Sequence, residues 1–351
     1  MKYSASLIGC GRVGVLLEED KLRKKPASHI GGLLKLKSKV ILDSLCDINK
    51  ERLIYVSEKW KINNYYTDYK KLILERKPDI VIIATWTNTH KEIAEYCMKN
   101  GVKGMVLEKP VATSLKDAGY LLKLSEKYKT KIVVNHERRW DSLFLKTKEI
   151  IDNRELGKLV TIYSNVYTQS SFNEKINLIG ELGGGVLLHD GTHLIDIIRY
   201  FAGDIKYVIG DLNMDKNAGV EKKASAFLLT ENNVNVFLQA ASEMDFFNFE
   251  LDLIFKNGRI KIGNGIREYY TTESSKRYEG FKDLVKKEFP VYEKIIDPFS
   301  GAINEVIIAI EKDIEPYSSL IDGVKAMEVI FSIYHSHFKN NKRIILPLNN
   351  I

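Results

Sequence analysis

The sequence is poor in proline and cysteine and has no long hydrophobic run. Its 351 residues include only 7 prolines, which argues against a proline-rich linker or a long disordered tract. The 3 cysteines show no CxxC spacing, which excludes a disulfide framework or a zinc ribbon and favours a reducing cytoplasm. No apolar stretch approaches the roughly 18 residues that span a bilayer. We therefore expect a cytoplasmic protein with no membrane partner.

The charge balance is mildly basic. Lys and Arg total 53 and Asp and Glu total 46, so the formal net charge is +7. The basic residues are interspersed with acids, which is typical of a solvated surface, and we expect no nucleic-acid partner. Hydrophobic residues make up 44% of the chain, enough for a full core. At about 150 residues per domain, the length indicates roughly two domains.

Up to about Trp140, short apolar strands alternate with amphipathic segments. This pattern predicts a parallel sheet with right-handed crossovers, an α/β domain over residues 1–140. The expected strands are Ser4–Ile8, Val40–Cys46, Ile80–Ala84, Val106–Glu108 and Ile132–Asn135. The expected helices are Lys50–Trp60, Lys70–Arg76, Lys91–Asn100 and Ser114–Tyr128.

The pattern changes after Trp140. Strand-like alternation predominates, Asn257-Gly258 is a strong hairpin signal, and helices are expected within Gly183–Tyr200 and towards the end of the chain. We predict an α+β domain over 141–351 with a large, mostly antiparallel open sheet and a last helix available to pack back on the first domain. The expected strands are Leu159–Gln169, Ile205–Leu212, Lys223–Thr230, Val234–Gln239, Phe247–Phe255, Arg259–Ile262 and Arg343–Leu346, and the late helices are Ala302–Lys312 and Ser319–Phe338.

A glycine-rich turn follows the first strand and opens an apolar helix. The run Gly9-Cys10-Gly11-Arg12-Val13-Gly14 lets the backbone approach a pyrophosphate at a helix N-terminus. Asp47, at the end of the second strand, is placed to accept hydrogen bonds from ribose hydroxyls and to repel a 2′-phosphate. The pattern favours NAD over NADP; the alternative is a glycine turn used only for packing.

The segment 18–26 interrupts this motif because it is too charged for an unbroken dinucleotide helix. Either a solvated surface insertion splits the helix, which we favour, or a lid covers the cofactor.

Four further segments complete a known order of motifs. They are 84–90 (ATWTNTH), the Glu108-Lys109-Pro110 element, 135–139 (NHERR) and the glycine-rich segment 183–196 that contains His193. With the glycine-rich turn, they resemble the Gfo/Idh/MocA family (glucose–fructose oxidoreductase, inositol dehydrogenase and rhizopine-catabolism proteins) over essentially the whole chain. The resemblance implies an N-terminal Rossmann domain and a C-terminal domain whose open sheet faces its partner. We thus expect a homo-oligomer, a dimer or tetramer.

The resemblance also implies a reaction and its residues. The family transfers a hydride between nicotinamide C4 and a carbinol or carbonyl of a sugar or polyol, and a nucleotide-linked sugar is one such substrate. Lys109 matches the lysine that contacts the reacting hydroxyl and the nicotinamide ribose, and His193 matches the catalytic histidine. The positions that match the cofactor site are Gly9, Gly11, Arg12, Val13, Gly14, Asp47, Thr85, Asn88, His90, Glu108 and Lys109.

Two positions depart from the family pattern. Trp86 stands where a proline is usual, and His189 stands where an acid usually precedes the catalytic histidine by four residues, with Asp190 one position later. The identity of the substrate is therefore left open.

Oxidation of an alcohol needs a base of near-neutral pKa on the hydroxyl. His193 begins near that range, whereas Lys109 needs a lowered pKa to serve as base and otherwise donates to the oxygen. We assign His193 as acid/base and Lys109 as orienting donor, with the exchanged roles as the alternative. His189, His193 and Asp196 share one face of a continuous helix, which would suit a transition metal, but hydride transfer needs none and we expect none.

Further candidates concern the substrate. Arg138 and Arg139 follow a strand at the ligand-binding edge, where an arginine clamps an anion or forms an interdomain salt bridge. Alternating polar residues from Tyr163 to Gln169 line the pocket or merely cover the sheet. The predicted substrate residues are His136, Arg138, Arg139, Tyr163, Asn165, His189, Asp190 and His193. Competing functions are a glycosidase-like enzyme that regenerates its NAD and a non-enzymatic dinucleotide sensor.

Overall fold

The computed structural model describes residues 2–169, 184–215, 217, 219–292 and 297–348, and the chain divides into two compact units. Unit 1 comprises Met1–Trp140 together with Ile296–Val324, and unit 2 comprises Asp141–Ile295 together with Lys325–Ile351. The sequence pattern assigns all of 141–351 to one domain, whereas the structure places 296–324 with the first unit. These residues return to unit 1 because they contain an apolar helix that packs on its sheet.

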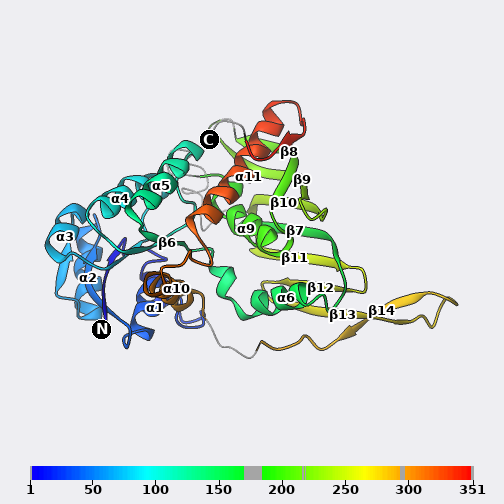
Figure 1. The fold of residues 1–351 in the computed structure, drawn as a ribbon, viewed down its shortest axis with the longest axis horizontal. Helices are drawn as coiled ribbons and strands as arrows, with labels where there is room; N and C mark the ends of the chain where they lie inside the picture. The colour runs from blue at the N-terminus through cyan, green and yellow to red at the C-terminus, as the bar shows by residue number, and fades with distance from the viewer. Residues whose placement is uncertain (1, 170–183, 216, 218, 293–296, 349–351) are drawn as a thin grey trace. The chain divides into compact units, whose positions relative to one another are not determined.

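Unit 1 contains a six-stranded sheet in the order β3-β2-β1-β4-β5-β6, and all of its strand pairs are parallel (Figure 1). This is the doubly wound order of a dinucleotide-binding fold, whose ligands bind beyond the carboxyl ends of the strands. The predicted Rossmann domain is confirmed. Its strands are β1 (Tyr3–Ile8), β2 (Val40–Cys46), β3 (Asn64–Tyr66), β4 (Ile80–Ile83), β5 (Gly104–Leu107) and β6 (Lys131–Val134).

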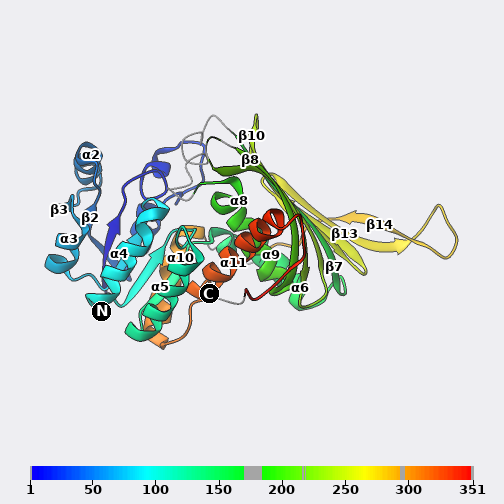
Figure 2. The same cartoon turned by 90° about the horizontal axis from the view of Figure 1, so that it is seen from above.

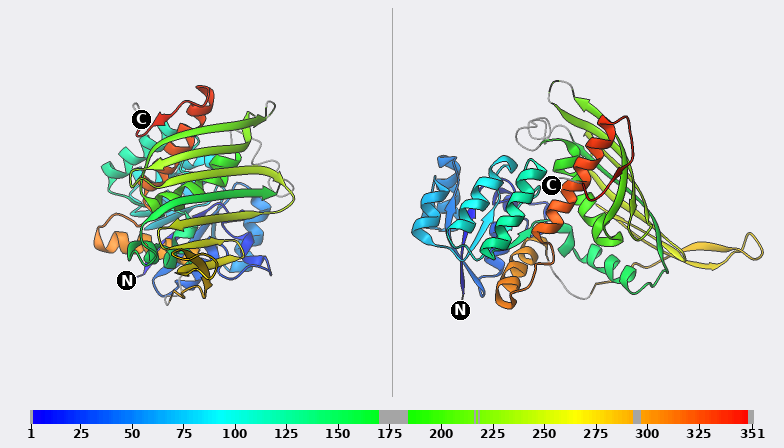
Figure 3. Two further views of the ribbon diagram at one scale, coloured as in Figure 1. Left: turned by 90° about the vertical axis from the view of Figure 1, so that its right-hand side faces the viewer. Right: turned by 45° about the horizontal axis from the view of Figure 1, so that its top comes forward.

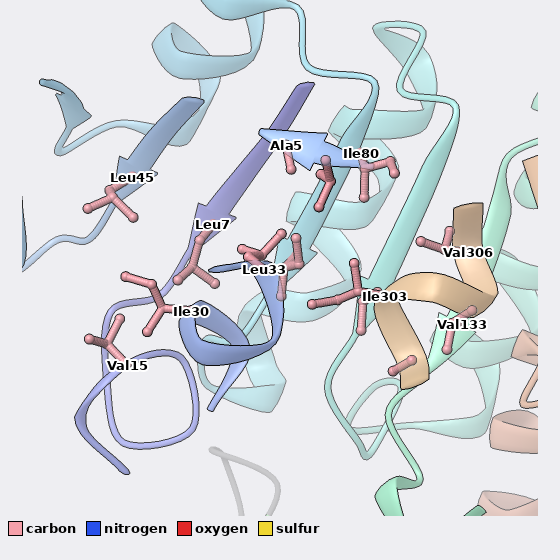
Figure 4. Packing of buried hydrophobic residues seen from close by; sticks show 14 of the residues in the cluster. Ala5, Leu7, Val15, Ile30, Leu33, Leu45, Ile80, Val133, Ile303 and Val306 are labelled. Atoms are coloured by element: carbon pink, nitrogen blue, oxygen red, sulfur yellow. The ribbon is translucent and has the colours of Figure 1, made fainter. Parts of the chain in front are cut away.

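Helices cover both faces of this sheet. On one face, buried side chains of α1, α2 and α10 pack in one cluster with the strands, as Ile30, Leu33, Ile303 and Val306 show in Figure 4. Because both faces are covered, the strands are continuously apolar. The α-helices of unit 1 are α1 (His29–Lys35), α2 (Lys50–Trp60), α3 (Tyr69–Arg76), α4 (Thr87–Lys99), α5 (Leu115–Tyr128) and α10 (Pro298–Lys312), and the short 3-10 helices are η1 (Leu16–Glu19) and η2 (Glu137–Trp140).

The helix that opens after Gly14 is split, as the charged segment 18–26 predicts. The His29 N–H donates to the Val13 carbonyl at 3.1 Å and the Ile30 N–H to the Gly14 carbonyl at 3.0 Å. The helix α1 therefore continues the turn that Gly14 begins, and residues 15–28 form an insertion between them. The charges of this segment explain the split, because they could not be buried against the sheet.

Two carboxylates of the insertion fix its position: Glu18 joins its two ends, and Glu19 attaches it to α2. Glu18 Oε2 accepts from the Ala27 N–H and from the Ser28 hydroxyl, both at 2.8 Å. Glu19 lies 2.9 Å from Lys59 and so ties the insertion to α2. Residues 21–25 are exposed. Within unit 1 the segment thus has the character of a solvated surface insertion.

Unit 2 contains a nine-stranded sheet in the order β14-β13-β12-β11-β7-β10-β9-β8-β15 (Figure 3). All neighbours are antiparallel except β7 and β10, so the predicted mostly antiparallel sheet is confirmed. The hairpin expected at Asn257-Gly258 joins β11 to β12. The strands are β7 (Leu159–Gln169), β8 (Ile205–Asp215), β9 (Val220–Thr230), β10 (Asn235–Met244), β11 (Asn248–Phe255), β12 (Gly258–Gly263), β13 (Ile266–Ser274), β14 (Lys282–Lys287) and β15 (Ile344–Ile345).

The helices of unit 2 lie on one face of this sheet (Figure 2). They are α6 (Ser142–Asp152), α8 (Val186–His189), α9 (Gly191–Ala202) and the part of α11 (Leu320–Phe338) that belongs to this unit. The single helix expected within Gly183–Tyr200 is interrupted at Asp190, and its expected start at Gly183 lies outside the described residues. Among the helices described, none is both long and apolar enough to cross a bilayer.

Candidate functional site

The loop after β1 is folded so tightly that two of its glycines leave no room for a side chain. Gly9 has φ +98°, and a Cβ there would lie 2.3 Å from the carbonyl oxygen of Ala84. A Cβ on Gly14 would lie 2.0 Å from the carbonyl oxygen of Gly9. Gly11 differs, since no described atom beyond its chain neighbours lies within 4 Å of such a Cβ. The loop is thus open at Gly11, and the Arg12 side chain beside it is exposed.

Asp47 lies directly after β2 and its carboxylate accepts four hydrogen bonds. Oδ2 accepts from the Cys10 N–H at 2.8 Å and from Arg52 Nε at 3.1 Å. Oδ1 accepts from the Asn49 N–H and from Arg52 Nη2, both at 2.8 Å. A carboxylate offers about four acceptor positions, so a ribose hydroxyl must displace or share one that Arg52 uses. Asp47 therefore holds the glycine-rich loop through Cys10 and pairs with Arg52.

The segment after β4 brings Thr85, Asn88 and His90 to the same edge of the sheet. The helix α4 begins at Thr87, four residues before its expected start, so Asn88 lies in its first turn. His90 is buried, and its ring nitrogens lie 2.9 Å from the Pro110 carbonyl and 3.2 Å from the Thr85 carbonyl. Burial lowers the pKa of His90 despite these contacts. A neutral His90 thus links this loop to the Glu108-Lys109-Pro110 element.

Glu108 is buried at the end of β5 and is held by two residues that the sequence patterns did not single out. Its Oε1 lies 2.7 Å from His29 Nε2 and accepts from Asn135 Nδ2 at 2.6 Å. Burial alone raises the pKa of this carboxyl, but His29, Lys109 and Asn135 outweigh burial and leave the pKa below its ordinary value. The ionised Glu108 ties α1, β5 and β6 together beside Lys109, whose side chain is partly exposed.

The residues after β6 divide between the interior and the surface. His136 is buried and Arg138 is partly exposed. The Arg139 guanidinium is buried against Asp322 at 3.1 Å and donates to the Tyr317 carbonyl at 2.6 Å. Of the two interpretations of this arginine, the structure shows a salt bridge, and it lies within unit 1 rather than between domains. Tyr317 precedes α11 and Asp322 lies in its first turn, so Arg139 links the end of β6 to the start of α11.

The helices α8 and α9 carry His189, Asp190 and His193. His189 ends α8, and its Nδ1 lies 3.2 Å from Asp190 Oδ1. His193 is partly exposed in the first turn of α9, where its N–H donates to the Asp190 carbonyl at 3.2 Å, and Asp196 is buried. Asp190 interrupts the continuous helix on which His189, His193 and Asp196 were expected to share a face. Among the described residues, no group of three or more His, Cys, Asp or Glu is placed to hold a metal ion.

Tyr163 and Asn165 lie on the other side of the large sheet. Strand β7 alternates, so that Ile162, Ser164 and Val166 are buried towards the helices, while Tyr163 is 50% exposed. Tyr163 stacks on Phe237 with ring centroids 5.2 Å apart. Both predicted residues line a depression of about 510 Å³ on this face. The structure does not bring them together with His193, because side chains on odd positions of β7 point away from α9.

Two family descriptions match this chain. Residues 7–136 match "Oxidoreductase family, NAD-binding Rossmann fold", and residues 144–261 match "GFO/IDH/MocA C-terminal domain". The chain belongs to the Gfo/Idh/MocA oxidoreductase family. The first match covers the glycine-rich loop, Asp47 and Lys109, and the cofactor of that family domain is NAD.

Relatives and structures of the family agree with the fold. A myo-inositol 2-dehydrogenase of Thermotoga maritima is 27% identical over 198 residues, which are 56% of this chain and 54% of the relative. The chain thus spans about half the length of this curated relative. The WlbA dehydrogenase of Chromobacterium violaceum, solved with NADH and UDP-GlcNAcA, superposes with a TM-score of 0.80 at 18% identity, covering 99% of this chain and 97% of that one. A levoglucosan dehydrogenase solved with NADH gives 0.83 at 15% identity, covering 99% and 100%.

Proposed function

We propose that the protein is an NAD-dependent dehydrogenase or reductase that acts on a carbinol or carbonyl of a sugar, polyol or nucleotide sugar. The observation that carries this proposal is the carboxyl edge of the Rossmann sheet, where the open Gly11 loop, Asp47 and the anchored Glu108-Lys109 element come together. The names of the relatives, an inositol dehydrogenase and a levoglucosan dehydrogenase, support the substrate class.

The proposed chemistry uses two side chains of this protein. When bound, NAD supplies a nicotinamide C4 that accepts the hydride from the carbinol carbon. His193 takes the hydroxyl proton as the carbon–hydrogen bond breaks, and returns it to the carbonyl oxygen in the reverse direction. Lys109 donates a hydrogen bond to the same oxygen and so favours its developing negative charge.

The activity is tested by incubating the protein with NAD and a panel of sugars, polyols and nucleotide sugars while NADH absorbance is followed. We expect NADH to form with at least one alcohol. Substrate conversion without net NADH would support the glycosidase-like alternative. NAD binding with no conversion of any compound would support the sensor and contradict the proposal.

Asp47 is expected to set the cofactor preference. Replacing Asp47 with alanine removes a charged acceptor worth about 1.5–3 kcal/mol per hydrogen bond and also removes its repulsion of a 2′-phosphate. The ratio of kcat/KM for NADP to that for NAD should therefore rise about tenfold or more. Arg52→Gln is the matched control, because it keeps the Asp47 charge and frees two of its acceptor positions. An unaltered ratio in the Asp47 variant would show that this carboxylate does not contact the ribose.

We also propose that a second copy of the chain covers the outer face of the large sheet, as the family resemblance implies. The support is a row of aromatic rings in contact: Tyr163 stacks on Phe237, and Phe227 meets Phe237 edge-on with ring centroids 5.4 Å apart. Phe237 is 44% exposed, which is unusual for so large an apolar ring. We further propose a cytoplasmic location, which is consistent with three free, buried cysteines.

A charge on this face should dissociate the oligomer. We expect the wild-type protein to sediment as a dimer or tetramer and Phe237→Glu to sediment as a monomer, because a buried carboxylate has no partner on an aromatic face. Tyr65→Glu is the control, since Tyr65 is 48% exposed on β3 of unit 1. A wild-type monomer at micromolar concentration, or a Phe237 variant with an unchanged sedimentation coefficient, would refute this interface.

A further inference from the structure

A buried carboxylate lies under the start of α8. Glu221 is on β9 and is 2% exposed. Its Oε1 accepts from the Leu187 N–H at 2.7 Å, and its Oε2 accepts from the Tyr334 hydroxyl of α11 at 3.0 Å. Each carboxylate oxygen is therefore bound to a different helix. None of the chemistry derived above uses this residue.

Glu221 takes the place of a helix cap that the sequence does not supply locally. The residue at the N-cap of α8 is Gly185, which has no side chain to accept from the first turn. Gly185 has φ +101°, and a Cβ on it would lie 2.5 Å from Glu221 Oε2. Two features therefore require glycine at position 185: its positive φ and the close approach of the Glu221 carboxylate.

A short chain of backbone hydrogen bonds connects this cap to His193. The His189 N–H donates to the Gly185 carbonyl at 2.9 Å, and the Asp190 N–H donates to the Val186 carbonyl at 3.1 Å. The His193 N–H then donates to the Asp190 carbonyl at 3.2 Å. Since α8 has only four residues, a shift of its first turn moves the Asp190 junction and the start of α9 with it.

We propose that Glu221 is a positioning residue that fixes α8 against β9 and thereby sets the place of the His193 imidazole. The effect on catalysis through His193 rests on the proposed function. The attachment of α8 to β9 by Glu221 does not depend on it. The carboxylate acts through the backbone of Leu187, and Tyr334 orients it from the opposite side. His193 is partly exposed on a short helix, so its geometry depends on such support.

Charged residues next along β9 and at the end of α8 have partners of their own, whereas Tyr334 of α11 is bonded to Glu221 itself. On β9, Lys222 pairs with Asp215 at 2.9 Å and with Glu243 at 2.6 Å. At the end of α8, His189 contacts Asp190. On α11, burial and the nearby carboxylate raise the pKa of Tyr334 well above its ordinary value, so its hydroxyl remains a donor.

The ionisation of Glu221 should appear in the stability of the protein. Burial raises the pKa of Glu221 to about 7, although hydrogen bonds from Leu187 and Tyr334 lower it. The folded pKa exceeds the ordinary value of 4.5, so this group's stabilisation is full below that value and is lost as the pH rises through about 7. The Tm of the wild type should therefore fall relative to that of Glu221→Gln between about pH 5 and about pH 8.

The decisive test is hydrogen exchange of the full-length protein. In Glu221→Ala, the amides of residues 186–193 should exchange about tenfold faster, while the peptides of unit 1 keep their protection. In Glu221→Gln, the amide oxygen still accepts from Leu187, and most of the protection should return. With a substrate from the panel, kcat of the alanine variant should fall about 10²-fold with little change in the KM for NAD, and glutamine should recover most of it.

Three outcomes would overturn the proposal. They are native protection of residues 186–193 in Glu221→Ala, a loss of protection spread evenly over unit 2, and a wild-type Tm that does not change relative to Glu221→Gln across this pH range. The last comparison applies even where the alanine variant fails to fold. Glu250→Gln, which removes a carboxylate paired with Lys261 on the same sheet, is the matched control. If the wild type oxidises no alcohol, the proposed function fails. Hydrogen exchange and Tm still test whether Glu221 fixes α8.

Discussion

The His193→Ala variant is expected to lose about 10²–10⁴-fold in kcat, because no other group assigned here accepts the hydroxyl proton. In Lys109→Ala, kcat should fall about 10²–10³-fold, because that is the usual cost of removing one hydrogen-bond donor to a developing oxyanion. NAD affinity should change only severalfold in the His193 variant, because the cofactor contacts proposed here come from unit 1. Steady-state kinetics with the alcohol found in the panel, together with NAD titration, measure both effects.

Controls separate chemistry from folding in this experiment. His335 is exposed on α11 and Lys116 is exposed on α5, so His335→Ala and Lys116→Ala remove the same side chains at places without an assigned role. Both controls should keep the wild-type kcat. Unchanged turnover in either the His193 or the Lys109 variant would remove that residue from the mechanism. Loss of the acidic limb of the pH profile for alcohol oxidation in the Lys109 variant, and not in the His193 variant, would favour the exchanged roles.

Alanine variants of the glycine-rich loop should show whether the loop binds the cofactor or serves only for packing. In Gly11→Ala, the new Cβ would have no atom of the described residues within 4 Å beyond its chain neighbours. The Tm of this variant should therefore equal that of the wild type. Its NAD affinity should nevertheless fall about 10²-fold or more, because the new methyl lies where the pyrophosphate approaches, and overpacking of this kind costs about 1–3 kcal/mol or more. Calorimetric titration with NAD and thermal unfolding measure the two quantities.

Gly14→Ala is the counterpart of that variant. Its Cβ would lie 2.0 Å from the Gly9 carbonyl oxygen, so it should lose both NAD binding and the stability of unit 1. If Gly11→Ala bound NAD as the wild type does, the glycine-rich turn would serve packing alone and the dinucleotide assignment would be wrong.

The sequence predicted well wherever a local pattern determines the outcome. The strands β2 and β7 and the helix α2 have the expected bounds, because a continuous or alternating apolar run and a capping Asn49 define them locally. The glycine-rich loop, Asp47 and Lys109 lie at the carboxyl edge of one sheet because that edge follows from the parallel topology.

Features that depend on distant contacts were not predictable in this way. The charged segment 18–26 predicted the interruption of the helix after Gly14, but not that Glu18 closes the insertion by accepting from Ala27. Glu108 is anchored by His29, a residue 79 positions away in the chain. The side of the sheet that Tyr163 faces, the partner of Arg139 and the cap that Glu221 gives α8 likewise depend on tertiary packing.

The central claim is that a hydride passes between a carbinol carbon and nicotinamide C4, and isotope transfer tests it most directly. The protein is incubated with NAD and with sugars, polyols and nucleotide sugars deuterated at their carbinol carbons, and the cofactor is then analysed by mass spectrometry. We expect NADH that carries one deuterium at C4, with the label lost in His193→Ala. NADH without deuterium, or a cofactor that binds and acquires no label from any compound, would contradict it.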